Sequence, residues 1–138
     1  MATRELSSSV KNLRALDNSN ITSDTNTDGV EIDTQGFNSV TCVLASGLGG
    51  SYTDGTYTVN VLESDTSGSG YAAADSSVIV SQSGNSAVDA DNECAWVGYV
   101  GNKRYIKVRC VSTSTSSGAN ICGWVILGHP HNAPVTSN

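Results

Sequence analysis

The stretch TYTVNVLE at residues 56–63 decides the fold class of this chain. Its strict alternation places Tyr57, Val59 and Val61 on one face and Thr58 and Asn60 on the other. Side chains of a β-strand point to opposite faces in turn, so this pattern predicts a strand with one buried and one wet face. The segment is too short and too rich in Val, Thr and Tyr to favour a helix.

A second stretch, RYIKVRCV at 104–111, follows the same rule. It directs Ile106, Val108 and Cys110 inward and leaves Tyr105, Lys107 and Arg109 outward. Further strands are predicted at 38–46, 77–82, 95–100 and 120–127, with weaker candidates at 19–23 and 29–33. Two Asp-Gly pairs, at 28–29 and 54–55, predict turns in which glycine takes a positive φ. The fold class expected is all-β, as a single antiparallel β-sandwich or jelly-roll-like domain.

The 138 residues, 38% of them hydrophobic, suffice for one domain. We place an N-terminal arm at 1–18, the β-sandwich domain at 19–127 and a C-terminal arm at 128–138. In the first arm Leu6, Val10, Leu13 and Leu16 recur at spacings of four, three and three, which predicts a short amphipathic helix. Such a helix needs a surface to lie on.

The formal charge of −6 argues against nucleic acid as a partner, because phosphate binding needs a positive surface. No window approaches the roughly 20 apolar residues that cross a bilayer. Charged residues interrupt the first 20 positions, so a secretion signal is not expected either. The chain is predicted to be soluble and to bind no membrane.

We expect no enzyme, cofactor or metal. The serines lack a nearby base, since His129 and His131 are the only histidines. These two flank Pro130 in an extended tail and are too few to bind a metal alone. Asp24, Asn26 and Asp28 resemble the start of a calcium loop, but Gln35 stands where that loop needs glutamate.

Four cysteines lie in apolar runs and are interpreted as small core residues. A hairpin folded about Ser116 would place Cys110 opposite Cys122, so a disulfide at that pair stays open. Trp96 and Trp124 are predicted to be core, although exposed rings would suit stacking on sugars. The basic cluster Lys103, Arg104, Lys107 and Arg109 fits an acidic partner surface or a solvated strand face equally well.

Four segments occur in an order that resembles a family of small tailed-bacteriophage head proteins: DTQGFNSVTCVLASG (33–47), YTDGTYTVNVLESDT (52–66), YVGNKRYIKV (99–108) and LGHPHNAPV (127–135). The resemblance covers roughly residues 30–135. It implies a cement or decoration protein on the capsid surface, assembled in the bacterial cytoplasm, with the major capsid protein and itself, as a dimer or trimer, for partners. The four cysteines depart from the family pattern, where aliphatic residues would be unsurprising.

We predict that the two arms, with the basic segment nearby, contact the capsid or sister subunits. The interface candidates are Leu6, Val10, Leu13, Lys103, Arg104, His129, Pro130, His131, Pro134 and Val135. Deleting either arm is expected to abolish capsid binding and to leave the β-domain folded. Two alternatives remain: another virion component of the neck, tail or fibre base, and a carbohydrate-binding β-sandwich that would need an exposed tryptophan.

Overall fold

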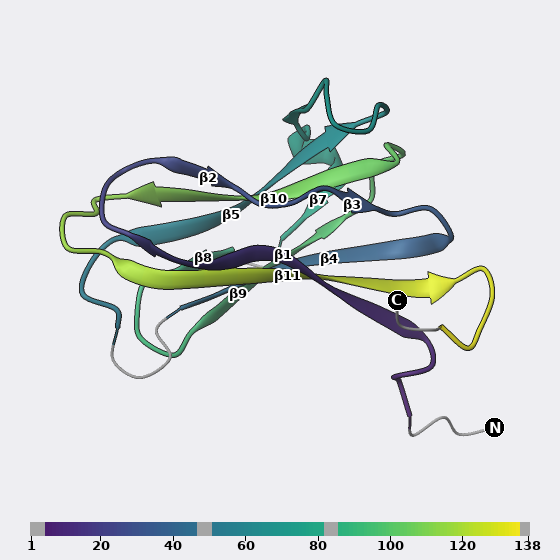
Figure 1. Ribbon diagram of the computed structural model, residues 1–138, viewed down its shortest axis with the longest axis horizontal. Coiled ribbons are helices and arrows are strands. Elements are labelled where there is room, and N and C mark those ends of the chain that lie inside the picture. Colours follow the sequence, from purple (N-terminus) through teal and green to yellow (C-terminus); the bar gives the residue numbers. More distant parts are fainter. Residues whose placement is uncertain (1–4, 47–50, 82–85, 136–138) are drawn as a thin grey trace.

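The computed structural model describes residues 5–46, 51–81 and 86–135. Two antiparallel sheets pack face to face, which confirms the predicted β-sandwich (Figure 1). The first, sheet A, has the strand order β1 (Val10–Ile21), β11 (Ala119–Pro130), β4 (Phe37–Ser46), β9 (Cys94–Tyr99) and β7 (Ile79–Val80).

The second, sheet B, has the order β2 (Asn26–Asp28), β10 (Tyr105–Thr113), β5 (Thr56–Ser64) and β6 (Ala72–Ala73). Two short strands join it from the side, β3 (Ile32–Asp33) against β10 and β8 (Ala87–Val88) against β5. A three-residue 3-10 turn, η1 (Ser76–Val78), precedes β7. Within the described ranges no helix has the length and apolar character needed to cross a membrane.

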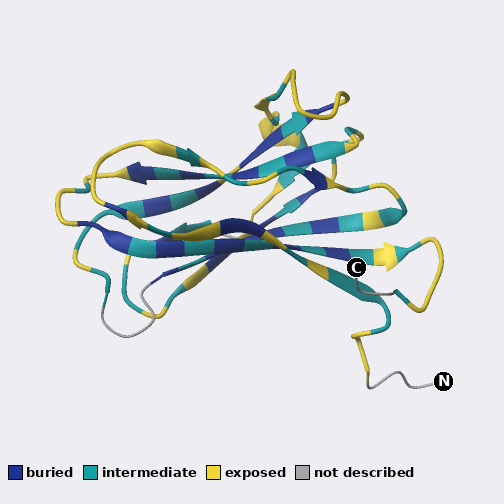
Figure 2. Cartoon of the chain, in the orientation of Figure 1, coloured by how far each residue is buried: buried dark blue, intermediate teal, exposed yellow. Residues whose placement is uncertain are grey.

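The alternation read from the sequence holds in the two strands that decided the fold. Tyr57, Val59 and Val61 of β5 are buried, and Ile106 and Val108 of β10 are buried between half-exposed neighbours. Figure 2 shows this as alternating bands of buried and half-buried residues along both strands. The inner faces of the two sheets therefore supply one continuous core, as a sandwich requires.

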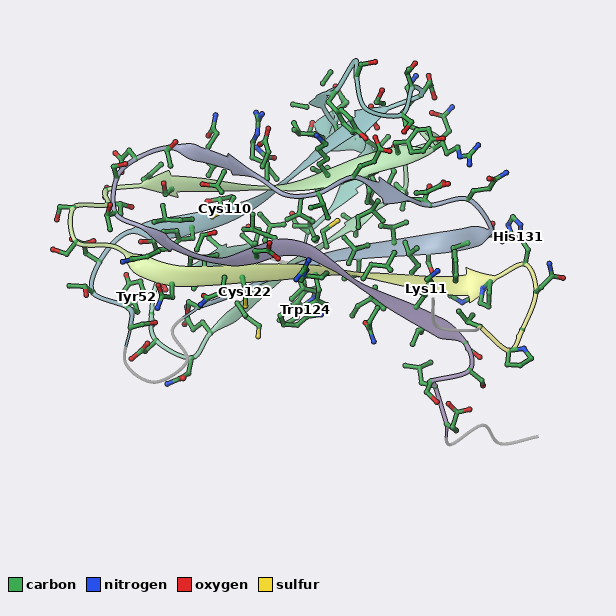
Figure 3. The ribbon with its side chains drawn as sticks, in the orientation of Figure 1. Lys11, Tyr52, Cys110, Cys122, Trp124 and His131 are labelled. Carbon is green, nitrogen blue, oxygen red and sulfur yellow. The ribbon has the colours of Figure 1, made fainter. Side chains whose placement is uncertain are left out.

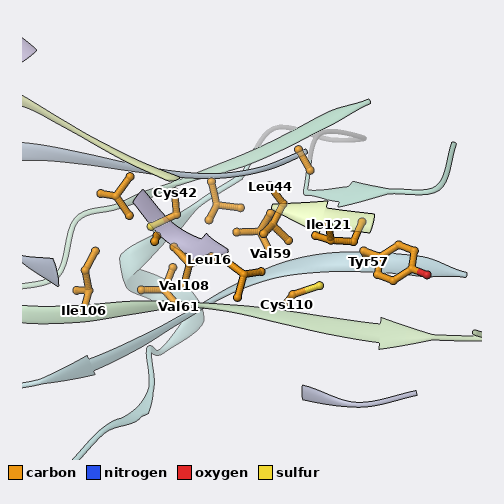
Figure 4. Close-up of a cluster of buried hydrophobic side chains, with 14 of the residues drawn as sticks. Leu16, Cys42, Leu44, Tyr57, Val59, Val61, Ile106, Val108, Cys110 and Ile121 are labelled. Carbon is orange, nitrogen blue, oxygen red and sulfur yellow. The ribbon is translucent and has the colours of Figure 1, made fainter. Parts of the chain in front are cut away.

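That core contains side chains from both sheets (Figure 4). Cys42 and Leu44 of β4 meet Val108 and Cys110 of β10, and each is fully buried. Tyr57 is also fully buried, and its hydroxyl donates to the carbonyl of Asp54 at 2.9 Å. Its ring thus contributes apolar area while its polar end stays hydrogen-bonded.

The helix predicted near the N-terminus is wrong, because residues 10–21 form β1 and pair with β11 along its length. The register of that pairing shifts between Arg14 and Leu16 and again between Leu16 and Ser19. Each shift is a bulge-like irregularity that breaks the two-residue alternation. Leu13 and Leu16, three residues apart, consequently both face the core, which imitates part of a helical spacing, whereas Val10 lines the outer groove.

Both domain boundaries predicted from the sequence fall inside strands of sheet A. β1 begins at Val10, within the expected 1–18 arm, and β11 continues to Pro130, beyond the expected start of the C-terminal arm at 128. The parts of the arms at 1–4 and 136–138 lie outside the described residues. What extends from the sandwich in the described chain is therefore residues 5–9 and 131–135.

The other strand predictions hold at 38–46, 56–63, 95–100, 104–111 and 120–127, with ends shifted by up to three residues. The segment predicted at 77–82 divides between η1 and the two-residue β7, and residue 82 lies outside the described residues. Residues 19–23 include the end of β1, and residues 29–33 include β3.

Glycine has different roles at the two predicted turns. Gly55 has φ 100°, as expected. Gly29 is not in the positive-φ region; its amide donates to Val108 O at 2.8 Å, and the amide of Val30 donates to Ala15 O at 2.7 Å. A Cβ at Gly29 would lie 2.1 Å from Ala15 O. The residue is glycine because the backbone here passes closely between β10 and β1 and joins the two sheets at this edge.

The cysteine predictions are only half confirmed. Cys42 and Cys110 are buried in the core, but Cys94 is exposed and Cys122 is partly exposed. Cys110 pairs with Val59 in sheet B, whereas Cys122 pairs with Ala45 in sheet A. The segment between β10 and β11 crosses from one sheet to the other instead of closing a hairpin. Cys110 and Cys122 therefore do not form the disulfide that the sequence left open, and all four thiols are free.

Candidate interaction surface

The structure brings together residues from the two ends of the chain. Leu6 and Val10, from the N-terminal side, line one groove of about 430 Å³ with His129 and Pro130 of the C-terminal side. Its remaining walls are Ser9, Ser39, Thr41, Ile126, Gly128 and Ala133. We call this hollow the terminal groove. Four of the ten predicted contact residues therefore meet in one place.

Backbone hydrogen bonds hold the two terminal segments in position. The amide of Val135 donates to Ser8 O at 2.9 Å, and the amide of His131 donates to Gly36 O at 2.8 Å. A second, more polar hollow of about 600 Å³ lies beside the first, lined by His131, Pro134, Val135, Lys11, Phe37 and their neighbours. Figure 3 shows Lys11 and His131 at the same end of the sandwich. The C-terminal segment thus folds back on the domain.

The two histidines do not converge on one point. The ring of His129 contacts Ser39 Oγ through Nδ1 at 2.7 Å, whereas the ring of His131 contacts Asn38 Oδ1 through Nε2 at 2.8 Å. His129 has φ 50°, so the backbone turns between them and the extended geometry assumed from the sequence does not apply. Among the residues that the structure describes, no group of three or more His, Cys, Asp or Glu is placed to hold a metal ion.

Three of the predicted contact residues lie apart from the terminal groove. Leu13 packs against the core from β1. Lys103 pairs with Asp65, and the Arg104 guanidinium lies 2.8 Å from a carboxylate oxygen of Asp33. The hydrogen bond from Arg104 holds the pKa of Asp33 below its usual value. Both cations thus already have an anionic partner within the chain.

The rest of the basic cluster is also satisfied from within. Arg109 binds Asp28 through two nitrogens, at 2.5 and 3.0 Å. The Lys107 ammonium lies 4.5 Å from the centre of the Tyr71 ring, a cation–π contact. We call this outer side of sheet B the charged face. Its groups are matched to one another, which fits the interpretation of a solvated strand face.

The outer side of sheet A is mainly apolar, unlike the charged face, and the sequence patterns did not predict it. Trp96 on β9 and Trp124 on β11 flank Val43 on β4 in one cross-strand row. Neighbouring rows contain Cys122, Ala45 and Cys94 on one side, and Ile126, Thr41, Gly98 and Val80 on the other. Cross-strand partners share a face of the sheet. We call these residues the tryptophan face.

The prediction that the tryptophans are core is wrong. Trp96 is 41% exposed, and Trp124 is half-buried and projects from β11 away from sheet B (Figure 3). Val43 points outward between them and is nevertheless only 6% exposed. We infer that the flanking indole rings cover it. β4, β9 and β11 are apolar on both faces, so alternation gave no sign of which face holds the tryptophans.

Neither a protein-family model nor a curated protein matches this chain. The resemblance to phage head proteins therefore rests on the four sequence segments alone.

Proposed function

We propose that this protein is a non-enzymatic structural component of a phage head, a cement protein that binds the major capsid protein lattice. The observation that carries the proposal is the terminal groove, in which predicted contact residues from both ends of the chain form one surface. A cement protein needs contact area and repetition, since many weak contacts on a lattice add up through effective concentration.

The groove has the anatomy of a protein contact. Leu6 is 68% exposed and stands at its rim, while Val10 and Ile126 form apolar walls. Backbone groups and side chains such as Ser39 and His129 give hydrogen-bonding capacity beside the apolar part. An apolar centre with a polar border is typical of specific protein interfaces.

The copy number in purified particles tests the proposal. Quantitative mass spectrometry is expected to give this protein in a simple lattice ratio to the major capsid protein. A few copies per particle would assign it to the neck, tail or fibre base instead. Its absence from particles would contradict every virion role.

A substitution tests the groove itself. Leu6→Asp places a charge at the exposed rim, and we expect co-sedimentation with capsids to weaken about thirtyfold, as for loss of a contact worth about 2 kcal/mol. Val30→Asp is the matched control, because Val30 is 49% exposed and does not line the groove. Removing residues 1–17 is unsuitable, since that deletion takes away more than half of β1.

The carbohydrate-binding alternative meets one of its two structural requirements, an exposed tryptophan, but not the other, polar groups beside the ring. Trp96 is exposed, as that alternative requires. However, the cross-strand neighbours of the two indoles are mainly apolar, with Val43 between them and Ala45 and Ile126 in the adjoining rows. Arg14, the charged partner of Trp124 on β1, is paired with Asp17. Sugar hydroxyls need convergent donors and acceptors beside the stacking ring. The surface therefore favours a protein partner.

A further inference from the structure

The tryptophan face stands out by its lack of charge. β4, β7, β9 and β11 contain no Asp, Glu, Lys or Arg. The charges of sheet A lie on β1, at Lys11, Arg14 and Asp17, and the last two form an exposed ion pair at 3.0 Å. An apolar area thus has a charged border along one side.

Two of the five large apolar side chains that are exposed in the described residues, Val80 and Trp96, lie in this area. Val80 is 51% exposed and lies on the same face as Trp96, because β7 pairs with β9 at Val80 and Gly98. Trp124 and Trp96 are separated by one strand, which sets their backbones roughly 10 Å apart. The result is a level apolar surface with two large aromatic anchors at its middle, the composition that dominates binding energy at protein interfaces.

The net charge of the chain indicates which partner this surface can bind. The chain has a net charge of −6, so two copies that meet through acidic surfaces repel each other. The tryptophan face adds no like charges to such a contact, and its apolar rows are complementary to themselves. The charged face, by contrast, would bring the same charges together in a self-contact, and its Arg109, Asp28 and Lys107 are already matched within one chain.

The size of the surface is that of a weak, reversible dimer. At about 4.8 Å between strands and about 3.4 Å per residue, β4, β9 and β11 over the six residues of β9, with the two residues of β7 beside them, give a patch of roughly 330 Å² per copy, or roughly 650 Å² for two copies. Upright side chains raise the accessible area above this flat value. Specific interfaces begin near about 1,000 Å², and those at the lower end are weak.

We propose that the tryptophan face packs against the same face of a second copy. A patch that contacts itself requires a two-fold axis, so the assembly is a dimer and not a trimer. The two A sheets would lie about 10 Å apart, as stacked sheets do, with the tryptophan rows at the centre. The pairing needs no capsid, because it concerns the free protein in solution, although the tryptophan face shares Thr41 and Ile126 with the terminal groove.

Sedimentation velocity across a dilution series tests the dimer. The wild type is expected to shift from monomer to dimer with rising concentration. Trp96→Asp and Val80→Asp each place a charge in the face and are expected to weaken association at least thirtyfold. Val30→Asp introduces the same charge at similar exposure outside the face and is expected to dimerise like the wild type.

Three results would overturn the proposal. One is a wild type that stays monomeric at every concentration, and another is a trimer. The third is a dimer that both Trp96→Asp and Val80→Asp leave intact. Circular dichroism establishes that the variants are folded, and Val80→Asp keeps the test valid if Trp96→Asp unfolds the chain. A monomer whose tryptophan emission changes when cello- or chito-oligosaccharides are added would assign the face to a glycan and would also overturn the dimer.

Discussion

The two outer faces of this sandwich are built on opposite principles. On the charged face, Arg109 forms an ion pair with Asp28, and the Lys107 ammonium lies over the Tyr71 ring. The charged groups of this face therefore have partners within the chain. On the tryptophan face, an outward valine is covered by indoles that themselves remain partly exposed. A face that is satisfied within its chain needs no partner, whereas an exposed apolar area marks an interaction site.

The largest difference is expected when a charge is added to each face. Val43→Asp puts a carboxylate beneath the two tryptophans, where it has little water, and we expect the free energy of unfolding to fall by about 3 kcal/mol. Asn60→Asp adds the same charge opposite Arg109 on the charged face. This substitution should change the free energy of unfolding by less than about 0.5 kcal/mol. Urea denaturation measures both. Equal losses would show that the faces do not differ in burial.

Removal of an aromatic ring gives a smaller contrast. Trp124→Ala uncovers Val43 and should cost about 2 kcal/mol, less than for a fully buried tryptophan. Tyr105→Ala, on the charged face, should cost about 1 kcal/mol, because its ring mainly supports the Arg104 guanidinium at 5.0 Å. Thermal unfolding of dilute samples, in which the chain is monomeric, compares the two. A greater loss for Tyr105→Ala would reverse the assignment of the faces.

The ion pairs on the two faces differ in burial, and we therefore expect them to contribute differently to the free energy of unfolding. Arg109→Ala should cost about 1 kcal/mol, because its pair with Asp28 is partly shielded, and Arg14→Ala about 0.2 kcal/mol, because Arg14 and Asp17 are largely in water. The hydrogen bond from Arg109 lowers the pKa of Asp28 below its usual 3.8. Its stabilisation is therefore present above that pH and lost as the pH falls toward the lowered pKa.

Denaturation at a series of acidic pH values checks this sign. The free energy of unfolding of the wild type should exceed that of Arg109→Ala by less and less as Asp28 becomes protonated. At low pH the two proteins should be equally stable. A gap of constant size down to about pH 2 would mean that the ion pair contributes nothing to the acid dependence.

The smallest effect concerns the thiols and leaves stability unchanged. Burial raises the pKa of Cys42 and Cys110 to about 12, so both stay protonated and unreactive at neutral pH. Cys94, exposed on the tryptophan face, should react with Ellman's reagent first, and its rate should fall as the protein is concentrated and the dimer forms. A rate for Cys94 that is independent of concentration would argue against its burial in the dimer.

The sequence predicted those strands that have one wet face. β5 and β10 alternate clearly, so both their existence and their buried sides were predictable. β9 and β11 are apolar on both sides, which predicts a strand but does not show which side is buried, and the tryptophans were assigned to the core for this reason. The apolar spacing of β1 predicts a helix because irregular pairing near Leu16 brings Leu13 and Leu16 to the same face.

The candidate site was predictable in part. Leu6, Val10, His129 and Pro130 were chosen from opposite ends of the chain and line one groove. The partners of Arg104 and Arg109 lie 71 and 81 residues away in sequence, and local patterns contain no information on such pairs. The tryptophan face arises from four strands brought together by topology, β11, β4, β9 and β7, so it exists only in the folded chain.

Hydroxyl-radical footprinting of concentrated wild type and the Val80→Asp variant reports the solvent accessibility of both outer faces in one experiment. We predict that Trp96 and Trp124 are oxidised more slowly in the wild type than in the variant, while Tyr71 and Tyr105 on the charged face react equally in both. Protection of the tyrosines, with tryptophans equally reactive in the two proteins, would rule out a dimer through the tryptophan face and place the contact on the other side of the sandwich.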